Sequence, residues 1–233
     1  MELVKFFEGC GKLSRGCNSS FICLAAKSKD SIHFGDFIPI SLIGLLYKII
    51  AKLLALRLIR VIGSVTDEVQ SAYVEGRNII EGLMIVNELC SRAKAISRKL
   101  LLFKASFNKA FDSVNWAFLE SIMDQMKFGV RWRLWICNCL ESGRASLIIN
   151  ESPTKEFPMS KGVRQGDPLS PFLFIIAIEG LNLAIKTVVE KDMFDGIKFP
   201  NSNMCLSHLF YADDALFIRE WSRRNIANLA RIL

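Results

Sequence analysis

The stretch Phe210–Asp214, which reads Phe-Tyr-Ala-Asp-Asp, decides how this 233-residue chain is interpreted. Mostly apolar, β-prone residues precede and follow the two acids, in Leu206–Leu209 and Ala215–Ile218. This arrangement predicts a tight hairpin with Asp213 and Asp214 at its tip. Paired carboxylates at a turn suit a hard divalent cation such as Mg²⁺. An acidic pair on its own is more often a solvated part of a loop, so its role can be inferred only together with the surrounding sequence.

Two longer motifs precede the acidic pair. Lys109–Trp116 reads Lys-Ala-Phe-Asp-Ser-Val-Asn-Trp, and Gly162–Pro171 reads Gly-Val-Arg-Gln-Gly-Asp-Pro-Leu-Ser-Pro. In this order the three motifs resemble the reverse transcriptase domain of LINE-type (non-LTR) retrotransposons, most closely those of plants. Group II intron maturases are the runner-up among polymerase relatives. The resemblance extends from about Asn18 to the C-terminus and includes shorter blocks at Asn18–Ile22, Pro39–Leu42, Tyr47–Ile49, Gln70–Tyr73 and Gly76–Arg77.

Composition favours a folded, intracellular, nucleic-acid-binding protein. Lys and Arg outnumber Asp and Glu by 30 to 23, and the pI is about 9.1, which favours an anionic partner. Ordinary surface lysines give the same surplus, so this signal is not specific. A hydrophobic content of 51% excludes a disordered chain. Seven cysteines without framework or zinc spacing predict reduced thiols and no zinc finger, and hence a nuclear or cytoplasmic location.

Two apolar runs could suggest a membrane protein. Phe37–Tyr47 is interrupted by Lys48, and Phe172–Ile178 ends at Glu179, so both are shorter than the roughly 20 residues that a spanning helix needs. We therefore expect buried helices and no membrane partner.

Periodicity and capping signals predict a mixture of helices and strands without regular βαβ alternation, which is the α+β class. Residues 1–36 are predicted as a loop with short extended pieces, because glycines recur in them. Helices are expected at Leu42–Ile62 after a Ser41 cap, at Ile79–Ala95, from Asn115 to Met126, at Trp132–Leu140, at Pro171–Glu190 and at Trp221–Leu233; strands are expected at Leu100–Phe107, Ala145–Ile149 and Thr154–Met159.

The resemblance implies a reverse transcriptase fingers–palm fold, in which helices pack on an antiparallel palm sheet. Residues 1–98 correspond to a fingers-like part and residues 99–233 to the palm. Because the chain stops soon after the acidic hairpin, we expect a fold that is incomplete at the C-terminus and has no thumb.

The resemblance also implies polymerase chemistry with two Mg²⁺ ions. It assigns Asp213 as a main metal ligand and Asp214 as its neighbour at the same site. The third family ligand is an aspartate on the central palm strand, five residues before Phe111, and this chain has Ser106 there. A neutral hydroxyl is a poor bridge between two cations, so we expect catalysis to be impaired at Ser106.

The remaining site residues match family positions near the nucleotide or the template. Phe111 matches the residue that packs under the incoming sugar, with core packing as the alternative. Arg164, Gln165 and Gly166 match residues near the template and the nucleotide, and Gly166 permits close backbone approach. Arg77 matches a fingers residue near the template or triphosphate. Where the family has an arginine before Pro-Ile-Ser, this chain has Ile38.

Taken together, the sequence predicts an RNA-directed DNA polymerase (a nucleotidyltransferase) by ancestry, with deoxynucleotides, an RNA template and an RNA–DNA duplex as partners. We expect a degenerate copy with impaired catalysis, so whether the chain is an active enzyme stays open. One alternative is an active polymerase that works with other chains. Another is a non-catalytic module that binds nucleic acid or protein. The sequence does not indicate an oligomeric state.

Overall fold

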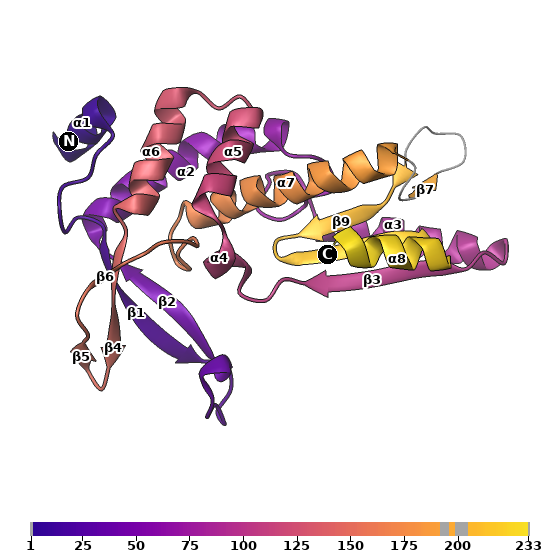
Figure 1. The fold of residues 1–233 in the computed structure, drawn as a ribbon, viewed down its shortest axis with the longest axis horizontal. Helices are drawn as coiled ribbons and strands as arrows, with labels where there is room; N and C mark the ends of the chain where they lie inside the picture. The colour runs from indigo at the N-terminus through magenta and orange to yellow at the C-terminus, as the bar shows by residue number, and fades with distance from the viewer. Residues whose placement is uncertain (1, 192–195, 199–204, 233) are drawn as a thin grey trace. The chain divides into compact units, whose positions relative to one another are not determined.

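The computed structural model describes residues 2–191, 196–198 and 205–232, and the chain divides into two compact units (Figure 1). Unit 1 contains the residues up to Val61 together with Lys109–Ala177. Unit 2 contains Ile62–Asn108 and the residues from Ile178 onward. The predicted division into a fingers-like part (residues 1–98) and a palm (residues 99–233) follows the roles that these parts have in the family, and it stays a prediction.

Unit 1 combines helices with a sheet. Its elements are α1 (Glu2–Cys10), β1 (Ser19–Ala26), a 3₁₀ turn (Phe34–Asp36), β2 (Phe37–Ile43), α2 (Leu45–Val65), α4 (Ala110–Ser113), α5 (Trp116–Gln125), α6 (Val130–Glu141), β4 (Arg144–Ile149), β5 (Ser152–Pro153), β6 (Phe157–Pro158) and α7 (Ser170–Glu190). The last residues of α2 and the second half of α7 belong to unit 2. Strand β1 pairs antiparallel with β2 and parallel with β4, and β5 and β6 pair antiparallel with β4.

The sequence prediction for the first 47 residues was wrong in three places. The run Phe37–Tyr47 was expected to be a buried helix, but it begins as strand β2 (Phe37–Ile43). Residues 1–36 were expected to be mainly loop, but they contain helix α1 and the eight-residue strand β1. Ser41 was expected to cap a helix, but it lies within β2, and its backbone N–H donates to the Gln165 carbonyl at 3.0 Å. Pairing with β1 and this long-range bond hold the backbone extended, so the helix begins only at Leu45.

The core of unit 1 is formed by helices α2, α5, α6 and α7. Its nearly fully buried side chains include Tyr47, Ile50, Leu54, Leu58, Leu119, Met123, Ile136, Cys139, Leu173 and Ile176. Asn115 caps α5 as predicted, because its side-chain oxygen accepts from the Phe118 N–H at 2.9 Å. Helix α7 is long and apolar enough to cross a membrane by length and composition. Its segment Phe172–Ile178 is nonetheless buried inside the protein, as expected for a core helix.

The hairpin from β4 to β5 turns through Asn150 and Glu151. The strand expected at Thr154–Met159 was placed wrongly, because Ser152–Pro153 already pairs with β4 as β5, and within the expected range Phe157–Pro158 forms β6. The register places Ile149 opposite Ser152, so the loop has two residues. Both have positive φ, 48° for Asn150 and 65° for Glu151. Two positive φ angles match the right-handed twist of the strands, but a side chain such as Glu at the second position is strained by about 1 kcal/mol.

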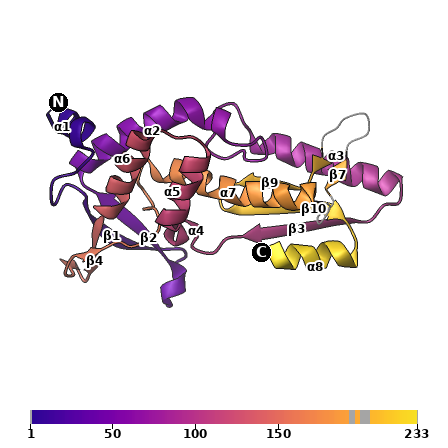
Figure 2. The ribbon, with the colours of Figure 1, turned by 45° about the horizontal axis from the view of Figure 1, so that its top comes forward.

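Unit 2 holds a second, antiparallel sheet. Its elements are α3 (Ile79–Ala95), β3 (Leu100–Ser106), β7 (Ile197–Lys198), β8 (Cys205–Leu206), β9 (His208–Tyr211), β10 (Asp214–Glu220) and α8 (Arg223–Ile232). Strand β10 lies between β3 and β9 (Figure 2). Apolar residues of α3 and the sheet form one cluster around Leu89, Leu206 and Ile218. The predicted helix at Ile79–Ala95 is confirmed, whereas the predicted end of the last helix, Leu233, lies outside the described residues.

Candidate functional site

The acidic pair lies at the tip of the hairpin formed by β9 and β10. Asp214 is the first residue of β10 and pairs with Tyr211, the last residue of β9, which leaves a two-residue turn of Ala212 and Asp213. Ala212 has a φ of 51°, a conformation that residues other than glycine rarely adopt. A positive φ at the first turn residue suits a two-residue hairpin. The chain therefore places its two carboxylates at a tight turn, as the sequence predicts.

Strand β3 brings Ser106 to this turn. Ser106 is directly opposite Asp214 in the antiparallel register. The next backbone N–H, that of Phe107, donates to the Asp213 carbonyl at 3.1 Å. Ser106, Asp213 and Asp214 therefore meet at one end of one sheet, although the sequence separates them by more than a hundred residues.

Lys104 is the cation of this site, and the sequence interpretation assigned no role to it. Its side chain lies on the same face of β3 as Ser106, because the two residues are two positions apart on a strand. The ammonium lies 2.9 Å from an Asp214 carboxylate oxygen. This hydrogen bond holds the pKa of Asp214 below its ordinary value; burial opposes the shift, and a hydrogen bond from the Ser106 hydroxyl adds to it. The negatively charged Asp214 carboxylate is thus already paired with a cation of the protein itself.

Arg164 lies in unit 1 and is buried, with a side chain that is 6% exposed. Its guanidinium is 3.4 Å from the Asp167 carboxylate and lies over the Tyr47 ring, with its central carbon 4.3 Å from the ring centroid. It also donates to the Asn18 carbonyl at 3.4 Å. Asp167 in turn accepts from the Tyr47 hydroxyl at 2.8 Å and from the Leu169 N–H at 2.9 Å. These contacts give Arg164 a structural role, and its contact with template or nucleotide stays a prediction.

Gln165 and Gly166 lie beside β2 in unit 1. The Gln165 carbonyl accepts from the Ser41 N–H, and Gly166 has a φ of 95°. A Cβ at Gly166 would lie 3.1 Å from the Ser41 carbonyl oxygen, so this glycine lies close to β2. The predicted contacts of Gln165 and Gly166 with template or nucleotide stay predictions. Gln165 also lines a small cleft of about 90 Å³ together with Asp112 and Lys161.

Phe111 stacks on another aromatic ring of unit 1. Its centroid is 4.6 Å from that of Phe174, and the planes are 13° apart. Its carbonyl accepts from the Val163 N–H at 2.8 Å, which ties α4 to the Gly162–Pro171 motif. Core packing, the alternative considered from the sequence, is therefore present. The contact with a sugar stays a prediction.

Arg77 lies in unit 2 and binds carbonyl groups of its own unit. Its guanidinium donates to the carbonyls of Gly63 at 3.0 Å, Thr66 at 3.1 Å and Gln70 at 2.8 Å, and also to that of Asp67. Two of these carbonyls belong to the last turn of α2 and its end, where a cation is favourable. Arg77 thus fixes the segment that follows α2, and its contact with nucleic acid stays a prediction.

Sequence reasoning missed a buried hydrogen-bond chain in unit 2. The Ser207 hydroxyl and His208 Nδ1 are 2.8 Å apart, and His208 Nε2 donates to the Asn182 side-chain oxygen at 2.9 Å. The Asn182 amide donates to Glu179, which also accepts from the Asp67 N–H at 3.2 Å. Burial lowers the pKa of His208 to about 4 and raises that of Glu179. Polar residues inside the apolar helix α7 were the available signal.

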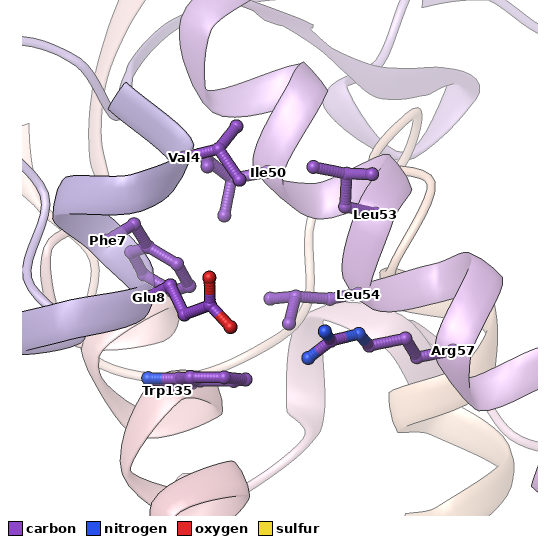
Figure 3. Close-up of a pocket in the computed structure, with 8 residues that line it drawn as sticks. All are labelled: Val4, Phe7, Glu8, Ile50, Leu53, Leu54, Arg57 and Trp135. Atoms are coloured by element: carbon purple, nitrogen blue, oxygen red, sulfur yellow. The ribbon is translucent and has the colours of Figure 1, made fainter. Parts of the chain in front are cut away.

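An apolar pocket of about 130 Å³ lies where α1 meets α2 and α6 in unit 1 (Figure 3). It is lined by Val4, Phe7, Glu8, Ile50, Leu53, Leu54, Arg57 and Trp135. The guanidinium carbon of Arg57 lies 5.7 Å from the Trp135 ring centroid. Because the lining is apolar apart from Glu8 and Arg57, the pocket does not suit a nucleotide.

Comparison with known proteins gives the class. Residues 27–232 match the family model described as "Reverse transcriptase (RNA-dependent DNA polymerase)". The fold resembles telomerase from Candida albicans in complex with a telomeric RNA fragment, with a TM-score of 0.62 and 12% identity, covering 99% of this chain and 43% of that one. The chain therefore belongs to the reverse transcriptase family, and its α+β structure is the reverse transcriptase fingers–palm fold, as predicted.

Relatives narrow the class to the non-LTR type. The chain is 29% identical over 210 residues to the Transposon TX1 uncharacterized 149 kDa protein of Xenopus laevis, covering 90% of this chain and 16% of the relative. It is 24% identical over 224 residues to the Pol polyprotein of the type-1 retrotransposable element R2 of Nasonia vitripennis, covering 95% and 21%. It is a LINE-type reverse transcriptase domain, and it spans about a fifth or less of the length of these two relatives.

The reverse transcriptase family uses divalent metal ions, so the donor set can be tested against that requirement. Among the residues that the structure describes, no group of three or more His, Cys, Asp or Glu side chains gathers at one place. Asp213 and Asp214 are the carboxylates present, Ser106 is neutral, and Lys104 already pairs with Asp214. This set does not fit a pair of Mg²⁺ ions.

Proposed function

We propose that this chain is the reverse transcriptase domain of a non-LTR retrotransposon in which nucleotidyl transfer is impaired at Ser106. In the ancestral reaction a primer 3′-hydroxyl attacks the α-phosphorus of a deoxynucleoside triphosphate. A new P–O bond forms, the bond to pyrophosphate breaks, and the hydroxyl loses its proton. Family membership and the hairpin that carries Asp213 and Asp214 support the ancestry.

One observation carries the proposed impairment. Asp214 faces a hydroxyl and an ammonium on β3, where the family resemblance requires a carboxylate. A cation in the protein and a missing acid both weaken binding of divalent ions at this place. Losing several kcal/mol of charge stabilisation at the phosphoryl group slows the transfer by about a thousandfold or more.

Binding of nucleic acid is the second part of the proposal. A net charge of +7 favours RNA and an RNA–DNA duplex, and such binding depends on phosphate contacts rather than on base sequence. Seven free cysteines fit an intracellular protein, in the nucleus or cytoplasm. The rival proposals are an active polymerase that needs other chains and a module that binds without catalysis.

Two measurements on the unmodified chain test the proposal. Filter binding to an RNA template with a DNA primer should show affinity that falls steeply with salt and shows little sequence preference. Primer extension with Mg²⁺ and deoxynucleotides should be undetectable or nearly so. Asp213→Ala, as a matched control, should leave duplex binding unchanged. Robust extension that Asp213→Ala abolishes would identify a working polymerase, and no affinity at low salt would remove the nucleic-acid partner.

A further inference from the structure

A short segment after α2 lies alongside the acidic hairpin. The Phe210 N–H donates to the Val69 carbonyl at 2.7 Å, and the Ser71 N–H donates to the Phe210 carbonyl at 3.1 Å. Gln70, between them, forms a parallel bridge with Phe210. The segment therefore pairs with β9 two residues before the turn, and it brings the Gln70 side chain to the turn itself.

The Gln70 side chain binds the backbone of the turn. Gln70 is 1% exposed. Its side-chain oxygen accepts from the Ala72 N–H at 2.9 Å and from the Ala212 N–H at 3.4 Å. Because both partners are donors, only the oxygen of the amide can face them, which fixes its orientation. Gln70 thus connects its own segment to the first residue of the turn.

The backbone of Gln70 is itself held in place. Arg77 donates to the Gln70 carbonyl at 2.8 Å and to carbonyls at the end of α2. The side chain of Gln70 therefore extends from a segment that is bound on one side by β9 and on the other by a guanidinium. A rigid support of this kind can restrict the conformation of the group that it binds.

The turn needs such a support. Ala212 has a positive φ, which an alanine adopts only when its surroundings impose it. On the far side of the turn, the Asp213 carbonyl accepts from the Phe107 N–H of the segment that follows Ser106. Gln70 and Phe107 thus bind the peptide units on either side of the Ala212–Asp213 peptide bond, and these units carry the backbone from which the acidic side chains project.

We propose that Gln70 is a positioning residue: its side-chain carbonyl fixes the backbone of Ala212 and thereby sets where the Asp213 and Asp214 carboxylates point. The inference rests on the proposed function, because the orientation of these carboxylates matters only if the hairpin is the ancestral transfer site. It adds a residue of the Gln70–Tyr73 block to that site through a contact with the protein rather than with substrate.

The first test measures the turn directly in the full chain. Gln70→Met keeps the length and removes the acceptor, so hydrogen exchange of the Ala212 amide should accelerate by about tenfold or more. The ¹³C shifts of the Asp213 and Asp214 carboxyls should change with it. Ser71→Ala is the matched control, because it removes only a hydroxyl contact of 3.3 Å to the Phe210 carbonyl. It should leave the Ala212 amide and both carboxyl shifts unchanged.

The second test measures the function of the turn. In a Ser106→Asp background, Mn²⁺ affinity followed by electron paramagnetic resonance should weaken about tenfold with Gln70→Met and stay the same with Ser71→Ala. Affinity for an RNA–DNA duplex should not change in either variant. Unchanged Ala212 exchange and carboxyl shifts in Gln70→Met, or equal effects of Ser71→Ala, would overturn the proposal.

If Gln70→Met does not fold, Gln70→Asn keeps an amide that is one methylene shorter and should give the same changes. If Ser106→Asp binds no Mn²⁺, the proposed function has failed, and the exchange and carboxyl shifts in the unmodified background still decide whether Gln70 positions the turn.

Discussion

Asp167 of unit 1 and Asp214 of unit 2 each pair with a cation, but in opposite environments. The Asp167 and Arg164 side chains are 4% and 6% exposed, and Asp167 has further donors in Tyr47 and Leu169. The Asp214 and Lys104 side chains are 39% and 64% exposed. Both aspartates belong to family motifs, so membership of a motif does not distinguish their roles. The burial of each carboxylate and the partners it binds show whether it is part of the scaffold or open to a ligand.

The largest expected effect comes from removing the buried acid. Asp167→Ala would leave the Arg164 guanidinium and the Tyr47 hydroxyl buried without their acceptor, so we expect a loss of about 3–5 kcal/mol in unfolding free energy. Denaturant unfolding measures it. The matched control in unit 1 is Glu156→Ala, whose partner Arg144 is 41% exposed and whose removal should leave the unfolding free energy nearly unchanged, because solvent screens the pair. Equal losses would remove the distinction between buried and exposed pairs.

His208 extends the comparison, because it is a buried polar group of unit 2. Burial lowers its pKa to about 4 from 6.5, Asp67 opposes the shift, and Lys186 and Arg219 add to it. The unfolded chain binds a proton below about pH 6.5 and the folded chain does not. Stability is therefore fully present above that pH and is lost as the pH falls toward 4, by up to about 3 kcal/mol.

Unfolding at a series of pH values checks this loss. The chain has two histidines, and the other, His33, lies on an exposed loop, so His33→Gln is a matched control. His208→Gln should flatten the fall between pH 6.5 and 4, and His33→Gln should leave it as in the unmodified chain. Indistinguishable profiles for the two variants would show that acid stability depends on other groups.

The smallest stability effect is expected at the exposed pair. Lys104→Gln removes the cation next to Asp214 and should change the unfolding free energy by about 1 kcal/mol or less, because solvent screens the pair. It should nevertheless tighten Mn²⁺ binding at the hairpin, since a positive charge near the carboxylates is gone. Arg98→Gln, at the exposed pair with Glu220, is the control for a general change in surface charge. Tighter binding in both variants would show that Lys104 has no specific role.

The sequence predicted elements with strong local signals. Asn115 as a cap, the helix at Ile79–Ala95 and the Asp213–Asp214 turn each follow from residues close together in the chain. Strand β1 and the continuation of β2 past Ser41 depend on pairing between strands and on a bond to Gln165, which local patterns do not encode.

The candidate site could likewise be predicted from the sequence only in part. Ser106 could be aligned with Asp213 and Asp214 through the family motifs, and the register of β3 with β10 places it next to Asp214. The contacts of Arg77, Arg164 and Gln70 could not be inferred, because a charged or amide side chain in a motif is compatible with both a ligand and an internal partner. Their partners lie on other segments and become visible only in the folded chain.

The central claim is that the residue at position 106 limits the rate of nucleotidyl transfer at this hairpin, and primer extension tests it most directly. Single-turnover primer extension with Mg²⁺ should compare the unmodified chain with Ser106→Asp and Ser106→Asn. Ser106→Asp should exceed both others by about tenfold or more, and we expect it to stay below a full family rate because Ile38 replaces the arginine that the family has at that position. Asp213→Ala in that background should abolish the gain. A Ser106→Asp rate no higher than that of Ser106→Asn would contradict the account.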